Sequence, residues 1–437
     1  MIRILKILLT GLITSFFIFP FNLPIGFEVN TKMIVAAFGL VIFLLDHVRG
    51  KEFRISKSFL LLSLLSIILS LWARVSMSYN HTMDGTYASY FMSLWVWLGG
   101  AYAVIWLIRT MHGDISVERI GQYLIGVCVA QCILAYSMTI FPGLHSFIDS
   151  LMGDSDSFMG KAEGRMYGLG AALDPTGLRF SAVLIITAFL IFNAFKEQRS
   201  KVLILYSISF LIIAVIGNMI SRSSVIGVGL SLVLISFLYL RDGKITLNIP
   251  YLAITAILFA GILVLVMHFY NTNPAFRSNL RFGFEGFFSL AEKGRWEVTS
   301  NNILKNMVVW PETMKTWIIG DGYCDNPASD PNFLGEIIGG YYKGTDIGYL
   351  RFIFYFGVPG MLMMVSVFVY VAWICGKRLD GFSILFLFML ISNLICWFKV
   401  SSDILMIFAP FLILAFLKEE EGEQEEQLIP ASENAQC

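Results

Sequence analysis

The sequence predicts an all-α polytopic membrane protein with about 12 transmembrane helices and one long loop subdomain. Of its 437 residues, 57% are apolar and only 14% are charged, whereas an ordinary soluble domain is about 25% charged. The mean hydropathy is +0.73, and apolar runs long enough to cross a bilayer recur along the chain. The formal net charge of zero argues against a nucleic-acid partner.

Twelve apolar runs approach the length of about 20 residues that a helix needs to cross the hydrocarbon core. The first run follows MIRILK and continues past position 20 without a small-residue cleavage site, so we expect a span rather than a signal peptide. The predicted spans are about 5–25, 32–48, 57–75, 92–110, 120–141, 178–195, 202–219, 223–240, 251–270, 346–375, 381–398 and 402–417.

The short loops predict the orientation of these spans. Lys and Arg concentrate in one set of loops, which read HVRGKEFRISK, RTMHGDISVERI, KEQRSK, RDGK and GKRLDG, and Arg3 and Lys6 fall on the same side. Cytoplasmic loops carry an excess of Lys and Arg. With an even number of spans, we therefore expect both termini to be cytoplasmic.

The spans divide the chain into six regions. The regions are five spans in 1–141, a first outer loop in 142–177, four spans in 178–270, a large outer loop in 271–345, three spans in 346–417 and an acidic tail in 418–437. The large outer loop is too long for a simple connector, so we expect it to form a small ordered subdomain on the outer membrane face. We expect the acidic tail to be disordered.

Arg222 is the sharpest exception to the charge pattern, because only about three residues separate the spans 202–219 and 223–240. An arginine at the centre of a membrane helix costs about 2.5–3.5 kcal/mol and less near the interface. Arg222 therefore either extends toward the lipid headgroups or faces a polar cavity. Neighbouring Asn218 and the serines of the turn favour the cavity.

Asp346 and Arg351 raise the same question at the end of the large loop. Five residues of helix separate them by about 7.5 Å along the axis and about 140° around it, so they need not pair with each other. Arg351 either extends outward or faces the same cavity as the other outer arginines. Several arginines around a cavity suit an anion with many oxygens, such as a diphosphate on a lipid. This feature alone fits both a lipid-linked sugar enzyme and a flippase.

Four local patterns resemble the bacterial O-antigen polymerase and ligase superfamily. They are a Gly-rich segment before a span, a Ser-Arg turn that opens the next helix, a loop arginine followed by a Gly-x-Gly turn, and a helix that begins polar and continues to Gly-x-x-Gly. In this chain they read GLGAALDPTGLRFSAVL at 168–184, SRSSVIGVGLSL at 221–232, GRWEVTSNNI and WIIGDGY at 294–303 and 317–323, and TDIGYLRFIFYFGVPGM at 345–361. The likeness covers about 165–365 and implies a GT-C-like membrane fold.

One departure from the family pattern distinguishes its two branches. Ligases of the superfamily have His-Asn-x-Tyr-Leu in the last pattern, whereas this chain has Asp346-Ile347-Gly348-Tyr349-Leu350. Asp346 thus occupies the histidine position, and the resemblance favours a polymerase.

The resemblance implies a metal-independent glycosyltransferase in the bacterial inner membrane. It would transfer a glycan from a polyprenyl diphosphate to a hydroxyl of the next lipid-linked repeat unit at the periplasmic face. Asp346 is the expected catalytic base, although an aspartate there also suits the helix N-cap. Tyr349 is an expected substrate-binding residue. The expected diphosphate-binding arginines are Arg222, Arg179 and Arg295, followed by Arg165, Arg281 and Arg351, and Arg222 counts as catalytic because fixed cations stabilise the leaving group.

No cofactor is expected. Asp321, Asp325 and Asp330 lack the spacing of a calcium loop, because Pro327 interrupts them and no Glu follows at the twelfth position. The expected partners are the lipid-linked oligosaccharide, membrane lipid and a protein that regulates chain length. The alternatives are an O-antigen ligase that transfers glycan to lipid A-core, and a twelve-helix transporter or lipid-linked glycan flippase. The outer-edge charges and the long loop run against a transporter.

Overall fold

The computed structural model describes residues 2–24, 29–49, 55–153, 165–242, 249–325 and 340–428. Within these residues the chain is all-helical, with 17 α-helices and no strand. The helices are α1 Ile2–Ile18, α2 Thr31–Arg49, α3 Lys57–Asn80, α4 Tyr90–His112, α5 Val117–Ile140, α6 Pro142–Ser150, α8 Leu173–Lys196, α9 Ser200–Ile220, α10 Ser224–Asp242, α11 Ile249–Thr272, α12 Pro274–Gly283, α13 Glu285–Lys293, α14 Thr299–Asn306, α15 Met314–Ile318, α16 Gly348–Arg378, α17 Ser383–Cys396 and α18 Leu405–Leu428.

Each of the twelve predicted apolar runs carries one of these helices: α1–α5, α8–α11 and α16–α18. Among the described residues, α3, α4, α5, α8, α9, α10 and α16 are long and apolar enough to cross a membrane. The chain is therefore a multi-pass membrane protein. Helix α17 is shorter than its predicted span because the chain turns back after Cys396, and the side chain of Asn393 accepts a hydrogen bond from the Ile404 amide at 3.1 Å.

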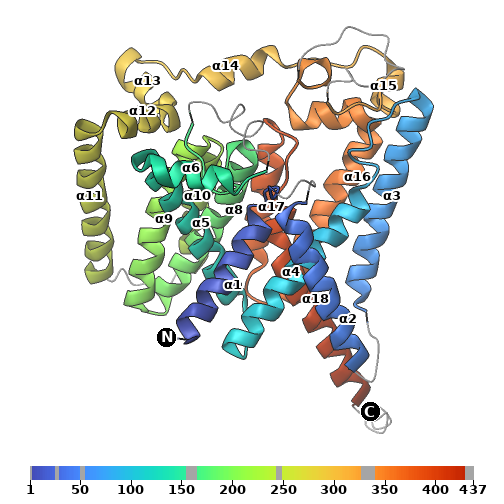
Figure 1. Cartoon of the computed structure of the whole chain (residues 1–437), viewed down its shortest axis with the longest axis horizontal. Coiled ribbons are helices and arrows are strands. Elements are labelled where there is room, and N and C mark those ends of the chain that lie inside the picture. Colours follow the sequence, from blue (N-terminus) through green and yellow to red (C-terminus); the bar gives the residue numbers. More distant parts are fainter. Residues whose placement is uncertain are drawn as a thin grey trace.

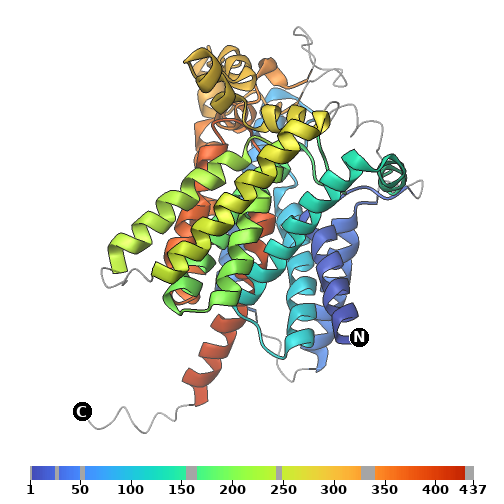
Figure 2. The ribbon, with the colours of Figure 1, turned by 90° about the vertical axis from the view of Figure 1, so that its left-hand side faces the viewer.

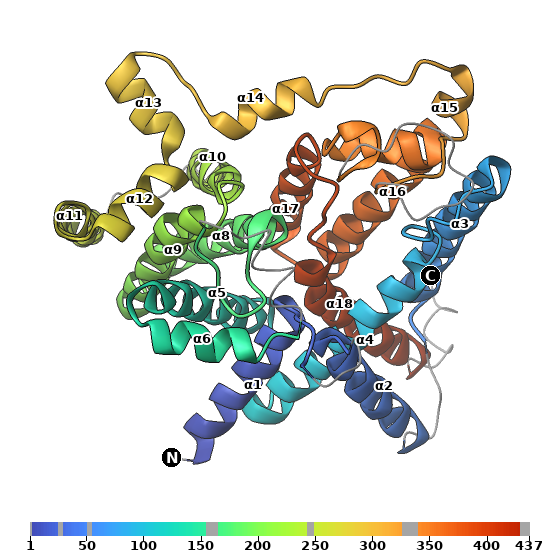
Figure 3. The same cartoon turned by 45° about the horizontal axis from the view of Figure 1, so that its top comes forward.

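The long helices form a bundle with two distinct ends (Figure 1). Helices α12–α15 cross one end, and we call this the loop end. Helix α1 begins and α18 finishes at the opposite end, as the side view in Figure 2 also shows. Seen from the loop end, α5, α6 and α8–α12 gather on one side of the bundle and α2, α3, α4 and α16 on the other (Figure 3).

Helix α8 is the central helix of the first group. Of its most apolar 18-residue window, 78% is buried, against 28% for α10. Small residues allow α10 to approach it closely: a Cβ at Gly227 would lie 2.3 Å from the Ser181 Cα. Close backbone approach at small residues is a common mode of helix association in membranes. The serine side chain also donates to the Ser223 carbonyl at 2.8 Å, which fixes the turn between α9 and α10.

Helix α16 is broken at Phe356–Gly357, where Gly357 has φ +71°. Pro359 has no amide hydrogen, so the carbonyl of Tyr355 loses its helical donor. That carbonyl instead accepts from the Ser76 hydroxyl at 2.6 Å and from the Gly322 amide at 3.1 Å. The break therefore joins α16 both to α3 and to the segment that follows α15.

The large loop, for which a small ordered subdomain was expected, is helical over much of its described part, 271–325 and 340–345. Its described part is a string of four short helices, α12–α15, that crosses the loop end from α11 toward α16 (Figure 3). We call residues 274–318 the strap. Helix α14 buries none of its residues. Each strap helix has ten residues or fewer, so the strap lies on the bundle instead of building a core of its own.

The acidic tail also departs from the expectation. Helix α18 continues to Leu428, so the first part of the segment 418–437, predicted to be disordered, is helical. Glu419 is 4% exposed, pairs with Arg378 at 2.5 Å and accepts a hydrogen bond from the Ser58 amide at 3.2 Å. These contacts anchor the helix. The rest of the predicted tail, 429–437, lies outside the described residues.

Candidate functional site

Polar side chains from four separate segments lie at the loop end of the bundle. The segments are the approach to α8, the turn between α9 and α10, the approach to α16, and the connection between α17 and α18. Asp174 ties three of them together. Its Oδ1 accepts from Lys399 Nζ at 2.6 Å, from Ser223 Oγ at 2.5 Å and from Ser221 Oγ at 3.2 Å. Gly177 makes room for this contact, since a Cβ there would lie 2.4 Å from Ser221 Oγ.

Asp346 lies in the electrostatic reach of this group. Its side chain is 21% exposed. Burial raises the pKa of Asp346 to about 6; Arg351 and Lys399 act to lower that pKa, and Asp174 acts to raise it further. The only hydrogen-bond donor to its carboxylate among the described residues is Arg351 Nη1, at 3.5 Å. Asp346 is therefore a weakly solvated carboxylate with spare capacity to accept a proton.

Asp346 is not the N-cap of α16, so that alternative is wrong. Helix α16 begins at Gly348, its N-cap is Ile347, and no side chain caps it. The Ile347 amide instead donates to Thr345 Oγ1 at 3.3 Å. The carboxylate of Asp346 is left for other contacts.

Arg351 is buried and held from several directions. Its side chain is 9% exposed and donates to Asp325 Oδ1 at 2.6 Å and to the Cys324 carbonyl at 3.2 Å. Its guanidinium also lies over the Tyr341 ring at 4.4 Å. Because Asp346 lies before the first turn of α16, the expected offset of about 140° does not apply, and Arg351 Nη1 lies 3.5 Å from Asp346 Oδ1. It neither extends to solvent nor stands free, so it serves to position the residues around Asp346.

Arg222 faces a polar cavity of about 580 Å³ beneath the strap. It forms an ion pair with Glu285 of α13 and lies 4.2 Å from the centre of the Phe282 ring. Arg165 lies over the same ring at 5.3 Å. Burial lowers the pKa of Arg222, and Glu285 opposes this effect. Of the two alternatives for Arg222, the structure therefore shows the one in which the side chain faces a polar cavity, and not the one in which it extends to the headgroups.

Arg281 lines the same cavity, while Arg295 lies outside it. Arg281 pairs with Glu292 at 2.7 Å and lies over the Phe288 ring at 4.8 Å. The side chain of Arg295 is 72% exposed and pairs with Glu297 at 2.7 Å. An exposed pair of this kind contributes little to stability and leaves the cation hydrated.

Arg179 is separate from both groups. Its guanidinium contacts Met406 Sδ at 3.6 Å and lies 5.8 Å from the Phe19 ring centre. Within the described residues no carboxylate oxygen lies within 4.0 Å of it, and its Nε has no hydrogen-bond partner. Its charge interacts with the buried carboxylate of Asp403, which is also close to the charge of Lys32, and its own hydrogen-bond donors are left largely unused.

Tyr349 is half-buried and contacts the last turn of α17 and the residues that follow it. Its hydroxyl donates to the Leu394 carbonyl at 2.9 Å, and its ring packs against Trp397 and Phe398. Its hydroxyl is thus occupied by the backbone of α17. It anchors the first turn of α16.

The sequence suggested that the outer arginines converge beside Asp346. In the structure they lie in separate places. Arg351 is beside Asp346, Arg222 and Arg281 share the cavity under the strap, and Arg179 lies apart near α1. The turn between α9 and α10 connects the cavity to Asp174, because Arg222 faces the cavity while both neighbouring serines bond Asp174. Within the described ranges no three His, Cys, Asp or Glu side chains are placed to hold a metal ion, and Asp330 of the predicted calcium-like spacing lies outside those ranges.

Asp174 and Lys399 are the two residues of this site that the sequence did not single out. Asp174 stands in the Gly-rich pattern at 168–184, and Lys399 stands in a short turn between the last two predicted spans. A lysine in a short turn on the side poor in cations was the available signal for Lys399.

Comparison with protein-family models, with curated proteins and with solved structures gave no match.

Proposed function

We propose that this protein is a membrane glycosyltransferase that polymerises lipid-linked oligosaccharides at the loop end of a twelve-span bundle. The observation that carries the proposal is Asp346, a half-buried carboxylate whose pKa of about 6 suits a general base near neutral pH. Two cations from separate segments, Arg351 and Lys399, lie within its electrostatic reach. The loop end would be the periplasmic face of the bacterial inner membrane.

The reaction assigns each group one task. The acceptor hydroxyl oxygen attacks the anomeric carbon of the donor glycan and forms the new glycosidic bond. The bond from that carbon to the diphosphate oxygen breaks, and the electron pair leaves with the diphosphate. Asp346 takes the hydroxyl proton. Arg179 and Arg165, which have no carboxylate within 4.0 Å among the described residues, stabilise the charge of the departing diphosphate.

The remaining charged residues shape the site. Arg351 holds the carboxylate of Asp346 in place, and the Lys399–Asp174 pair lies within its electrostatic reach. Arg222 and Arg281 line the cavity under the strap, where cations and carboxylates alternate around a space of about 580 Å³.

Reconstitution tests the proposal. Purified protein in liposomes is supplied with a polyprenyl-diphosphate-linked repeat unit, and the products are resolved by length. We expect polymer from the wild type and none from Asp346→Asn, while Arg222→Ala gives much less. Transfer to lipid A-core but not to a second repeat unit would instead identify a ligase. Movement of the lipid across the bilayer without any new glycosidic bond would identify a flippase.

A further inference from the structure

A second polar cavity lies at the other end of the strap. It has a volume of about 250 Å³ and is bordered by α15, by the turn that follows it and by the residues just before α16. The side chains that matter are Trp310, Glu312, Lys315, Asp321 and Lys343. None of these belongs to the group around Asp346.

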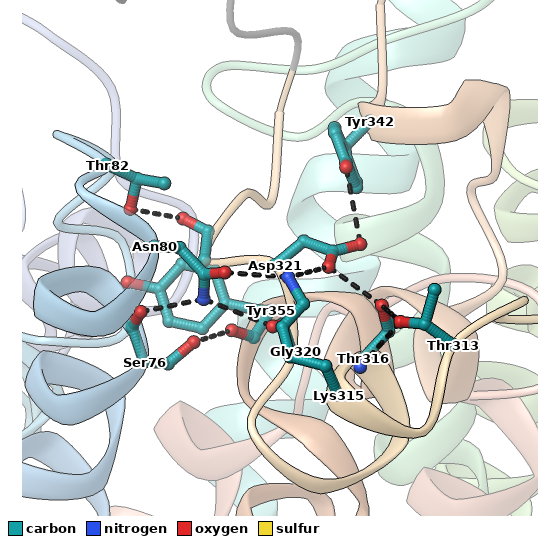
Figure 4. Close-up of polar contacts among 11 residues, drawn as sticks. Ser76, Asn80, Thr82, Thr313, Lys315, Thr316, Gly320, Asp321, Tyr342 and Tyr355 are labelled. Atoms are coloured by element: carbon teal, nitrogen blue, oxygen red, sulfur yellow. Dashed lines mark hydrogen bonds and ion pairs between the residues drawn. The ribbon is translucent and has the colours of Figure 1, made fainter. Parts of the chain in front are cut away.

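The floor of this cavity is held rigid by hydrogen bonds (Figure 4). Asp321 accepts from Lys315 Nζ at 2.6 Å, from Thr316 Oγ1 at 2.8 Å and from the Tyr342 hydroxyl at 3.3 Å. Lys315 also donates to Asn80 Oδ1 of α3 at 2.7 Å. The network is anchored to two spans, so a ligand would meet a preformed site and little ordering free energy would be lost on binding.

Trp310 presents a fixed aromatic face beside this floor. It is 61% exposed and stacks on Trp317, with ring centres 6.1 Å apart and planes 17° apart. Trp317 is itself fixed, since its Nε1 donates to the Pro311 carbonyl at 3.1 Å. One face of Trp310 is therefore supported from below while much of the ring stays accessible.

The charges of the cavity select against an anion. Two carboxylates, Glu312 and Asp321, face two ammonium groups, Lys315 and Lys343, so the formal sum is zero. Lys315 uses two of its three N–H donors on protein acceptors. The cavity thus offers spare donors and acceptors next to an apolar ring face. A ligand that fits has hydroxyl groups around its edge and C–H groups on its face.

We infer that this cavity binds a neutral sugar unit, with its C–H face on Trp310 and its hydroxyls toward Lys315 and Asp321. The inference deepens the proposed function and rests on it for the role of the ligand: the cavity would be the acceptor-glycan subsite. Lys343 stands three residues before Asp346, so the same short segment borders both sites. A glycan held here would direct its terminal hydroxyl toward the base.

The test is direct binding of sugars to protein in lipid nanodiscs free of sugar-headed detergent. Soluble oligosaccharides of hexose, N-acetylhexosamine and deoxyhexose are screened by saturation-transfer NMR. We expect binding by the wild type and a loss of about tenfold or more in Trp310→Ala, the size expected for one aromatic contact. Trp373→Ala is the matched control, because Trp373 is 52% exposed and stacks on Tyr370, yet lies on α16 away from the cavity.

The outcomes separate this inference from the proposed function. Sugar binding by Asp346→Asn should equal that of the wild type, because Asp346 does not line this cavity. Polymerisation by the same variant would contradict the role of Asp346 as the base and would leave the sugar-binding inference unaffected. Equal binding by Trp310→Ala, or no binding by any sugar of the panel, would overturn the subsite. Quenching of Trp310 emission by brominated phospholipid, taken from the difference to Trp310→Phe, would overturn it too, in favour of a membrane anchor beside the exposed Met314.

Discussion

Two carboxylates at the loop end lie in opposite environments. Asp174 receives three hydrogen bonds, one of them from an ammonium group, whereas Asp346 receives one long contact from Arg351. Carboxylates whose environments differ in this way take different roles in acid–base chemistry. Asp174 organises the segments that meet there, and Asp346 is free to exchange a proton.

The pH dependence of activity should follow Asp346. A base must be ionised, and burial raises the pKa of Asp346 to about 6, so the polymerisation rate should rise through pH 6 and level off above about pH 7. Because the folded-state pKa lies above the usual value of 3.8, ionisation costs the folded state stability at neutral pH. Asp346→Asn should therefore gain thermal stability over the wild type at pH 8 and lose that gain near pH 4.

Initial rates in liposomes and thermal unfolding across the same buffers check both parts. A rate that is flat between pH 5 and pH 8 would remove Asp346 as the base. If the difference in thermal stability between the wild type and Asp346→Asn does not change with pH, the pKa of Asp346 is not raised in the folded state.

Arg179 should act on the donor rather than on the fold. It forms no ion pair within 4.0 Å among the described residues, and the buried Asp403, whose charge interacts with it, keeps the charge of Lys32 in Arg179→Gln. A charge-assisted hydrogen bond contributes about 1.5–3 kcal/mol, so the KM for the lipid diphosphate should rise about 10- to 100-fold. Arg295→Gln, at an exposed pair, is the matched control and should stay close to the wild type. Equal effects of the two substitutions would contradict the assignment.

Individual residues of the site were predicted unevenly. Asp346, Arg222 and Arg351 were found because each breaks the usual placement of charge around a span. Asp174 and Lys399 were missed: their ion pair joins segments 225 residues apart, and the one local signal, a lysine in a short outer turn, was not used. The assignment of Tyr349 to the substrate came from the resemblance alone, and its side chain is used to pack α16 onto α17.

At the level of elements, the break in α16 decides how the chain is joined together. The stretch FGVPG at 356–360 places a glycine and a proline inside an apolar run, yet the sequence analysis treated 346–375 as one span. Neither the hydrophobic periodicity nor the hydropathy of the sequence reveals the break, because α16 is apolar on both sides of it. Its partners, Ser76 and Gly322, come from distant segments and could not be read from the run itself.

Gly357→Ala should damage this junction. Its φ of +71° is disfavoured for other residues by about 1–2 kcal/mol, and the new Cβ would lie 2.3 Å from the Ile318 carbonyl oxygen. We expect a destabilisation of about 2 kcal/mol or more and a clear fall in melting temperature, measured by thermal unfolding in detergent. Gly376→Ala, in the same helix with its nearest neighbour at 3.4 Å, should leave the melting temperature unchanged or slightly raised. The reverse order of the two variants would contradict this role of the break.

For the whole molecule, the hydropathy pattern was sufficient to locate the long helices but not to arrange them. Each predicted apolar run carries a helix, because the length of such a run is set by the bilayer itself. The division into two groups and the course of the strap depend on side-chain contacts between distant segments. The strap lies in the loop for which an ordered subdomain was expected, and its short helices bury few residues of their own, so no apolar pattern predicted its course.

The orientation can be tested on the intact protein. If the loop end faces the periplasm, a cysteine at Trp296, which is 52% exposed on the strap, should react with a membrane-impermeant maleimide in whole cells. A cysteine at Lys377, near the last turn of α16 at the opposite end, should react only after the membrane is opened. The native cysteines are replaced by serine in both variants. Labelling of Lys377→Cys alone in whole cells would invert the topology.

Helix α14 has one practical consequence. It buries none of its residues, yet Thr299 and Asn302 line the cavity of Arg222, and Thr299 donates to Glu285 through both its amide and its hydroxyl. Lys305 and Asn306, at the other end of the helix, line neither that cavity nor the cavity of Trp310. An epitope inserted after Asn306 would therefore report on insertion and trafficking at little thermodynamic cost, because the contacts of Thr299 with Glu285 stay in place.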